Sequence, residues 1–71
     1  MSGQRDLRGL APPEPMEIIL QWLDAASAGE QAQFHLPHTP FPLYEHLRLR
    51  RCHWECAAQS DGSAILTVFR D

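Results

Sequence analysis

The sequence contains no lysine, and its six basic residues are all arginines. Nine aspartates and glutamates outnumber them, so the formal net charge is −3. A nucleic-acid-binding domain gains much of its affinity by neutralising phosphates with clustered positive charge. A mildly acidic chain without a basic stripe is a poor candidate for that role, and we expect no nucleic-acid partner.

The sequence also lacks a long apolar run. No stretch approaches the roughly 18 apolar residues that indicate a membrane-spanning helix. Residues 1–6 are polar and contain no apolar segment of the kind found in a signal peptide. We therefore expect no membrane association and a cytoplasmic location.

The 71 residues leave room for one thin core. Chains of this size bury only about 60% of the surface that they expose when unfolded. We expect a flexible N-terminus over residues 1–5 and a single domain over residues 6–71. A thin core and a half-exposed sheet are compatible with a homodimer, but the sequence does not decide the oligomeric state.

Catalytic signatures are missing as well. The sequence shows no glycine-rich phosphate loop and no convincing set of nucleophile, base and acid. The two cysteines, Cys52 and Cys56, are four residues apart on a predicted strand, which places their Cα atoms roughly 13 Å apart. That separation excludes a disulfide or a shared metal ion between them. We interpret both as structural thiols that face the core together with Trp54.

An apolar stripe with helical spacing follows a cluster of prolines, and it predicts the main helix. The prolines are Pro12, Pro13 and Pro15, and the stripe consists of Met16, Ile19, Leu20, Leu23 and Ala26. Proline suits the first turn of a helix but not its interior, because it lacks an N–H group. The helix should therefore begin near Pro13, and Gly29 is its natural stop.

The remaining pattern predicts four strands and a second helix. Strands are predicted over residues 4–7, 31–36, 52–58 and 64–69, and the second helix over residues 41–50. The first two strands should be parallel because a helix joins them, and an Asp-Gly turn should make the last two a hairpin. The order β-α-β-α-β-β predicts an α+β fold, a two-layer open sandwich in which two helices cover one face of a four-stranded mixed sheet.

Two proline-rich segments resemble known families. The first reads Arg8-Gly9-Leu10-Ala11-Pro12-Pro13-Glu14-Pro15 and resembles the Arg-Gly-Leu-x-Cys-Pro-x-Pro motif of the TusA/SirA-like sulfur carriers. The second segment contains His38, Pro40, Phe41, Pro42, Leu43 and Tyr44. With Trp54, both segments together are most similar to a group of small bacterial proteins called domain of unknown function number two-two-four-nine. The resemblance implies the same β-α-β-α-β-β fold.

One position departs from the sulfur-carrier motif. In those proteins the motif's cysteine carries a persulfide at a helix N-terminus, where the helix dipole stabilises a thiolate. The matching residue here is Pro12, which has no nucleophile. Glu14 and Glu17 further offset the positive end of the helix. The resemblance therefore implies the fold of a sulfur carrier without its mechanism, and it favours a protein that is not an enzyme.

Two histidines are weak candidates for a metal or haem site. His35 and His38 are three residues apart at a predicted strand end, and such a pair without a third ligand is more often structural. The resemblance adds a suggestion, because relatives of the uncharacterised family occur beside haemerythrin-like, iron-binding domains. We otherwise expect no cofactor.

Three hypotheses about function remain open. The first is a non-catalytic interaction or regulatory module that binds a protein partner through the two motif segments or the polar sheet face. The second is a sulfur carrier or transferase that uses Cys56 or Cys52. The third is metal or haem binding through His35 and His38.

Overall fold

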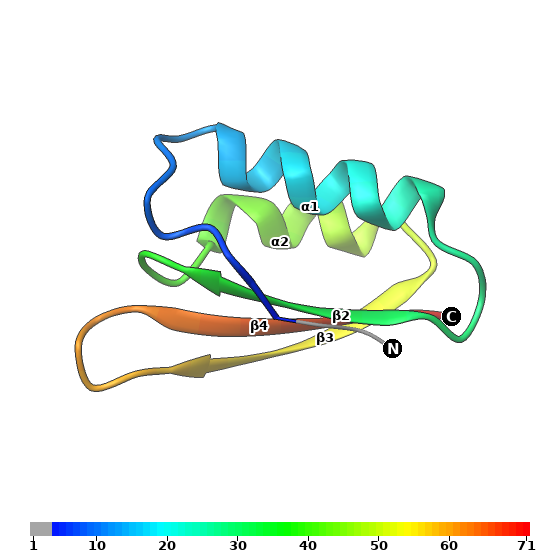
Figure 1. Ribbon diagram of the computed structural model, residues 1–71. Coiled ribbons are helices and arrows are strands. Elements are labelled where there is room, and N and C mark those ends of the chain that lie inside the picture. The colour runs from blue at the N-terminus through cyan, green and yellow to red at the C-terminus, as the bar shows by residue number, and fades with distance from the viewer. Residues whose placement is uncertain (1–3) are drawn as a thin grey trace.

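The computed structural model describes residues 4–71, which form one four-stranded sheet with two helices on the same face (Figure 1). The elements in chain order are β1 (Gln4–Asp6), α1 (Glu14–Ala25), β2 (Gln31–Leu36), α2 (Phe41–Arg48), β3 (Cys52–Ala58) and β4 (Ala64–Arg70). The predicted α+β class and the order β-α-β-α-β-β are confirmed. The helices form one layer and the sheet the other.

The sheet has the strand order β1-β2-β4-β3. As predicted, β1 and β2 are parallel, and β3 and β4 form an antiparallel hairpin. β4 lies between β2 and β3 and pairs with both. The two outer strands are therefore the short β1 and the seven-residue β3.

The predicted strand boundaries need small changes. β1 ends at Asp6, although the N–H of Leu7 still donates to the carbonyl of His35 at 2.8 Å. Gln4 and Arg5 fall both in the strand predicted over residues 4–7 and in the N-terminus expected to be flexible, and they belong to β1. Residues 1–3 of that stretch lie outside the described residues. β4 continues one residue further than expected, to Arg70.

The main helix begins where the prolines predicted but ends early. Pro13 is the N-cap of α1 and Pro15 lies in its first turn. The helix ends at Ala25, so the expected extension towards Gly29 is wrong. Residues 26–30 instead lead the chain down to the sheet, where Gly29, with φ of 90°, donates its N–H to the carbonyl of Arg70 at 2.8 Å. This contact between distant segments outweighs the local helical tendency.

The second helix is also shorter than predicted, ending at Arg48 instead of residue 50. Residue 50 lies beyond the end of α2, and its side chain forms hydrogen bonds with two partners. Its Nε donates to Oδ1 of Asp24 at 2.9 Å, and its Nη1 donates to the carbonyl of His46 at 3.0 Å. The ion pair with Asp24 joins the C-terminal ends of the two helices.

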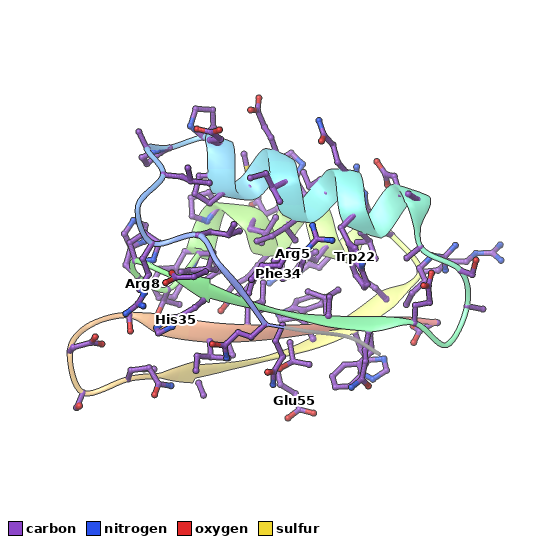
Figure 2. The ribbon with its side chains drawn as sticks, in the orientation of Figure 1. Arg5, Arg8, Trp22, Phe34, His35 and Glu55 are labelled. Carbon is purple, nitrogen blue, oxygen red and sulfur yellow. The ribbon has the colours of Figure 1, made fainter. Side chains whose placement is uncertain are left out.

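The core lies between the helices and the sheet. The residue at its centre is Phe34 of β2, which is fully buried and meets Trp22 of α1 edge-on at 5.9 Å between ring centroids (Figure 2). The predicted alternation of β2 is confirmed, because Ala32, Phe34 and Leu36 are buried. No helix among residues 4–71 is long and apolar enough to cross a membrane.

Candidate functional site

The loop between β1 and α1 is held at its start by an ion pair. Arg8 donates from its backbone N–H and its Nε to Oδ1 of Asp6, at 3.1 and 2.9 Å, and from Nη2 to Oδ2 at 2.7 Å. These hydrogen bonds hold the pKa of Asp6 well below its usual range. Leu7 beside them is buried, and its carbonyl accepts a hydrogen bond from the N–H of Leu10. The first motif segment therefore starts from a fixed turn.

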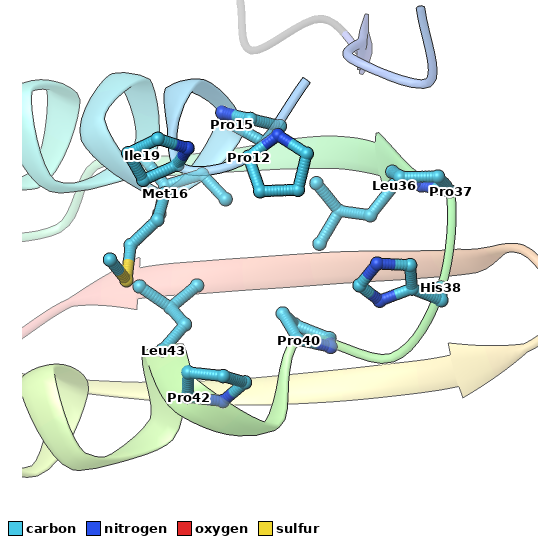
Figure 3. A pocket seen from close by; sticks show the side chains of 11 residues that line it. Pro12, Pro15, Met16, Ile19, Leu36, Pro37, His38, Pro40, Pro42 and Leu43 are labelled. Atoms are coloured by element: carbon cyan, nitrogen blue, oxygen red, sulfur yellow. The ribbon is translucent and has the colours of Figure 1, made fainter. Parts of the chain in front are cut away.

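Beyond this turn, the chain helps to enclose an apolar cavity of about 210 Å³ (Figure 3). The cavity lies where the start of α1, the loop after β2 and the start of α2 meet. Its lining residues are Pro12, Pro13, Pro15, Met16, Ile19, Leu36, Pro37, His38, Pro40, Pro42 and Leu43. All six prolines of the sequence are among them.

The prolines give this cavity an unusual wall. A proline has no backbone N–H, so a surface built from prolines exposes no unpaired donor to an apolar space. Its ring also fixes φ near −65°, which limits how far the wall can move. Both helices begin in the same way, with a proline at the N-cap and another in the first turn, namely Pro13 and Pro15 in α1 and Pro40 and Pro42 in α2.

His38 is the one side chain in the lining with polar atoms, and its ring points into the cavity (Figure 3). Its Nδ1 lies 3.3 Å from the carbonyl oxygen of Thr39. A carbonyl only accepts, so this contact assigns the proton to Nδ1 of the neutral ring. Nε2 is then left as an acceptor on an exposed side chain, at the edge of an otherwise apolar surface.

The structure brings together part of the predicted site. Seven residues of the two motif segments line the cavity: Pro12, Pro13, Pro15, His38, Pro40, Pro42 and Leu43. The others do not: Arg8, Gly9 and Leu10 belong to the preceding turn, Glu14 is exposed, and Tyr44 packs elsewhere. The sequence reasoning missed four lining residues, which are Met16, Ile19, Leu36 and Pro37. Pro37 could have been found from its place beside His38, whereas the other three have the pattern of ordinary core residues.

His35 and His38 are held by different partners. Nε2 of His35 lies 2.9 Å from Oγ of Ser63, on the sheet face opposite the helices. His38 lines the cavity on the helix side. Within the described part of the chain, no three residues of the types His, Cys, Asp and Glu are grouped so that they could hold a metal ion.

Neither cysteine lines the cavity. Both are half-buried on the helix side of β3, with Trp54 between them. Sγ of Cys52 donates to the carbonyl of Leu47 at 3.4 Å, and burial raises the pKa of this thiol. Cys56 lies beside Tyr44, where burial and then the neighbouring thiol raise the pKa of Tyr44 to about 12. A raised pKa is a property of a packed thiol rather than an activated one, as Cys52 shows.

The sequence matches one family over almost its whole length. The family is described as "Uncharacterized conserved protein (DUF2249)", and the match covers residues 4–70. The chain belongs to the DUF2249 family. This confirms the closer of the two resemblances drawn from the motif segments. No curated protein is similar to this chain.

Membership of the family places both proline segments in one matched region, from β1 to the end of β4. The cavity is therefore built entirely from residues within that region. The family's description states no activity, so a function has to be argued from the cavity itself.

Proposed function

We propose that this protein is a cytoplasmic, non-catalytic interaction module with a TusA-like fold, and that its proline-lined cavity receives an aromatic side chain of a protein partner. The observation that carries the proposal is the position of Pro12. In the sulfur-carrier motif this position holds the reactive cysteine, whereas here a proline forms part of an apolar wall.

The size of the cavity supports an aromatic occupant. An engineered apolar cavity of about 150 Å³ can hold a benzene molecule, and this one measures about 210 Å³. Proline rings offer flat, apolar surfaces on which an aromatic ring can pack. Because their φ angles are fixed, little conformational freedom is lost when a ligand is bound.

His38 narrows the choice of side chain. His38 is exposed in the free protein, but an occupant of the pocket would cover its acceptor. A ring that carries its own donor is then favoured, since a polar atom that loses water without gaining a partner is costly. Tryptophan has an N–H and tyrosine an O–H, whereas phenylalanine has neither. We therefore expect the partner to present a tryptophan or a tyrosine.

The direct test is a titration with N-acetyl-tryptophanamide in which the NMR signals of the cavity residues Met16 and Leu36 are recorded at each ligand concentration. We expect saturable shifts, and binding about 2- to 10-fold weaker in His38→Ala because one hydrogen bond is lost. His46→Ala is the matched control, since His46 is an exposed histidine on α2 outside the cavity. The absence of saturable shifts at millimolar ligand would contradict the proposed occupant.

A second measurement tests the role in the cell. Met16→Phe places a larger side chain in the cavity wall and should prevent occupation. Proteins captured from a bacterial lysate by the unmodified chain and lost with Met16→Phe are candidate partners. Retention of the same proteins by both chains would place their binding at another surface.

The alternatives differ in their readouts. A sulfur carrier that uses Cys56 or Cys52 would gain the mass of one sulfur atom after incubation with a sulfur donor and would lose it on reduction. A metal or haem protein that uses His35 and His38 would bind iron, copper, zinc or haem saturably and would lose that binding in His38→Ala. The proposal expects neither result.

A further inference from the structure

The outer edge of β3 is an unpaired row of backbone groups. In an antiparallel pair, successive residues turn their N–H and C=O groups alternately towards the neighbouring strand and away from it. The N–H of Asp71 donates to the carbonyl of Arg51, and the N–H of Gln59 donates to the carbonyl of Ser63. Odd-numbered residues of β3 thus bond to β4, and the even-numbered ones face outwards.

Among the described residues, little covers this edge. The N–H of Cys52 donates within a local turn to the carbonyl of Arg50, but no other backbone segment bonds the outward groups of Trp54 and Cys56. Natural sheets usually protect such edges with prolines, bulges or very short strands. β3 has seven residues, no proline and an unbroken register with β4.

The opposite edge is protected. Within residues 4–71, β1 spans only three residues, Gln4–Asp6, and the chain then leaves the sheet through the turn held by Asp6 and Arg8. The two edges therefore differ in a way that indicates a strand partner for β3 alone.

Apolar side chains are also exposed on and beside α2. The large hydrophobic side chains that are exposed in the described part of the chain are Phe41 and Leu49, with 70% and 83% of their surfaces accessible, and both belong to α2 or its C-cap. Phe41 meets Tyr44 edge-on at 6.0 Å, and Tyr44 stacks on Trp54 of β3 at 5.8 Å. An aromatic row thus extends from the exposed start of α2 to the middle of the free edge.

We propose that two copies of this chain pair antiparallel along β3, about a two-fold axis at Trp54, to form one continuous eight-stranded sheet. Charge favours this register over the one centred on Glu55. With Trp54 opposite its counterpart, His53 of each copy lies opposite Glu55 of the other. Shifting the pairing by one step would place the two Glu55 side chains opposite each other, and like charges at that position are unfavourable.

The groups on both faces are compatible with this register. Glu55 points away from the helices and is exposed (Figure 2). Nδ1 of His53 lies 2.8 Å from Oδ1 of Asp71. When the ring carries a proton on both nitrogens, Nε2 can donate to the Glu55 carboxylate of the second copy. On the helix side, Cys52 of each copy lies opposite Cys56 of the other, at a Cα distance of about 5.5 Å.

Hydrogen exchange and native mass test the proposal together. As the concentration rises from about 10 μM to about 1 mM, we expect a dimer to form by mass action and the N–H groups of Trp54 and Cys56 to become protected. The N–H groups of His53 and Glu55 already bond to β4 and should change little. A chain that stays monomeric, or a dimer in which the Trp54 N–H still exchanges rapidly, would overturn the proposal.

A charge variant tests the register. Glu55→Lys should raise the dimer dissociation constant about tenfold, because the disrupted pair occurs twice in a symmetric dimer. Glu17→Lys makes the same change of charge on the exposed surface of α1 and should leave the constant unchanged. Equal effects of the two variants would show that overall charge, and not this pairing, controls association.

The native cysteines allow a direct check. Treatment of the concentrated protein with diamide, which accepts the two hydrogen atoms released when a disulfide forms, should link Cys52 of one copy to Cys56 of the other. The Cα distance of about 5.5 Å expected between Cys52 of one copy and Cys56 of the other is within the range for disulfides, about 4.4–6.8 Å. Peptide mapping that finds only Cys52–Cys52 or Cys56–Cys56 links would contradict the register. Since these outcomes do not depend on the cavity, they are independent of the proposed aromatic ligand.

Discussion

The two faces of the sheet carry different kinds of side chain, apolar on the helix side and mostly polar on the other. On the helix side, Phe34, Leu66 and Val68 lie on neighbouring strands and are fully buried. On the other face, Gln33, Thr67 and Glu55 form a row across three strands, and Nε2 of Gln33 donates to Oγ1 of Thr67 at 3.2 Å. Stability thus comes mainly from one face, because apolar burial contributes more than a half-exposed hydrogen bond.

The unequal contribution of the two faces to stability should appear most strongly in a pair of substitutions. Phe34→Ala removes a fully buried ring that contacts Trp22 and should lower the free energy of unfolding by about 3–5 kcal/mol. Thr67 is next to Leu66 in sequence but lies on the open face, the face of the sheet that no helix covers. Thr67→Ala should lower the free energy of unfolding by less than about 1 kcal/mol. Chemical denaturation measures both. Similar losses for the two variants would mean that the open face is covered in solution.

One corner of the open face should be an exception. Ser63 is almost fully buried, and its hydroxyl donates to Oδ1 of Asp61 and contacts Nε2 of His35. Ser63→Ala should therefore cost about 1–2 kcal/mol, since two hydrogen bonds are lost. The hydroxyl is also the main reason that the pKa of Asp61 is lowered, so this pKa should rise in the variant. NMR titration of Asp61 provides the check, and an unchanged pKa would contradict the assigned contact.

Burial on the helix side should also slow the alkylation of the Cys52 thiol. Cys52 donates to the carbonyl of Leu47, and burial raises its pKa, so little thiolate should be present at neutral pH. Alkylation of Cys52 by iodoacetamide should be at least about tenfold slower in the folded protein than in urea. Mass spectrometry at the level of peptides follows the reaction. Equally fast labelling in both conditions would favour the sulfur-carrier hypothesis.

The smallest effect is expected for the ion pair between the ends of the helices. Arg50 lowers the pKa of Asp24 below its unfolded value, so this pair contributes stability above the unfolded pKa and loses it as the pH falls towards the folded one. Between about pH 6 and about pH 3, the unmodified chain should lose slightly more stability than Asp24→Asn. Thermal unfolding across this range measures the difference in stability loss, which should disappear if Asp24 were unpaired in solution.

The two helices show how far sequence patterns extend. Their starts were predictable, because a proline at the N-cap or in the first turn is a local constraint on φ and on hydrogen bonding. Their ends were not. α1 stops where Gly29 must reach Arg70, and α2 stops where Arg50 must reach Asp24. Both partners are distant in sequence, so no local pattern could indicate them.

The candidate site also has features that the sequence predicted and features that depend on distant contacts. The two proline segments were identified from their residues, and seven of the predicted positions line the cavity. That they enclose one cavity follows from the parallel crossover between β1 and β2, which sets the start of α1 beside the loop after β2. The closeness of His35 and His38 in sequence suggested a shared ligand. His35 lies on β2 and contacts Ser63 on the open face, whereas His38 lies in the loop after the strand and lines the cavity on the helix side.

The sequence by itself determined the order of the elements, the faces of the strands and the absence of a nucleophile at Pro12, because periodicity and residue chemistry are local properties. Only the tertiary structure decided that all six prolines meet in one place, that Tyr44 turns to Trp54 instead of the cavity, and that one edge of the sheet is left open. These features depend on contacts between residues far apart along the chain, and such contacts exist only after the sheet and helices have packed.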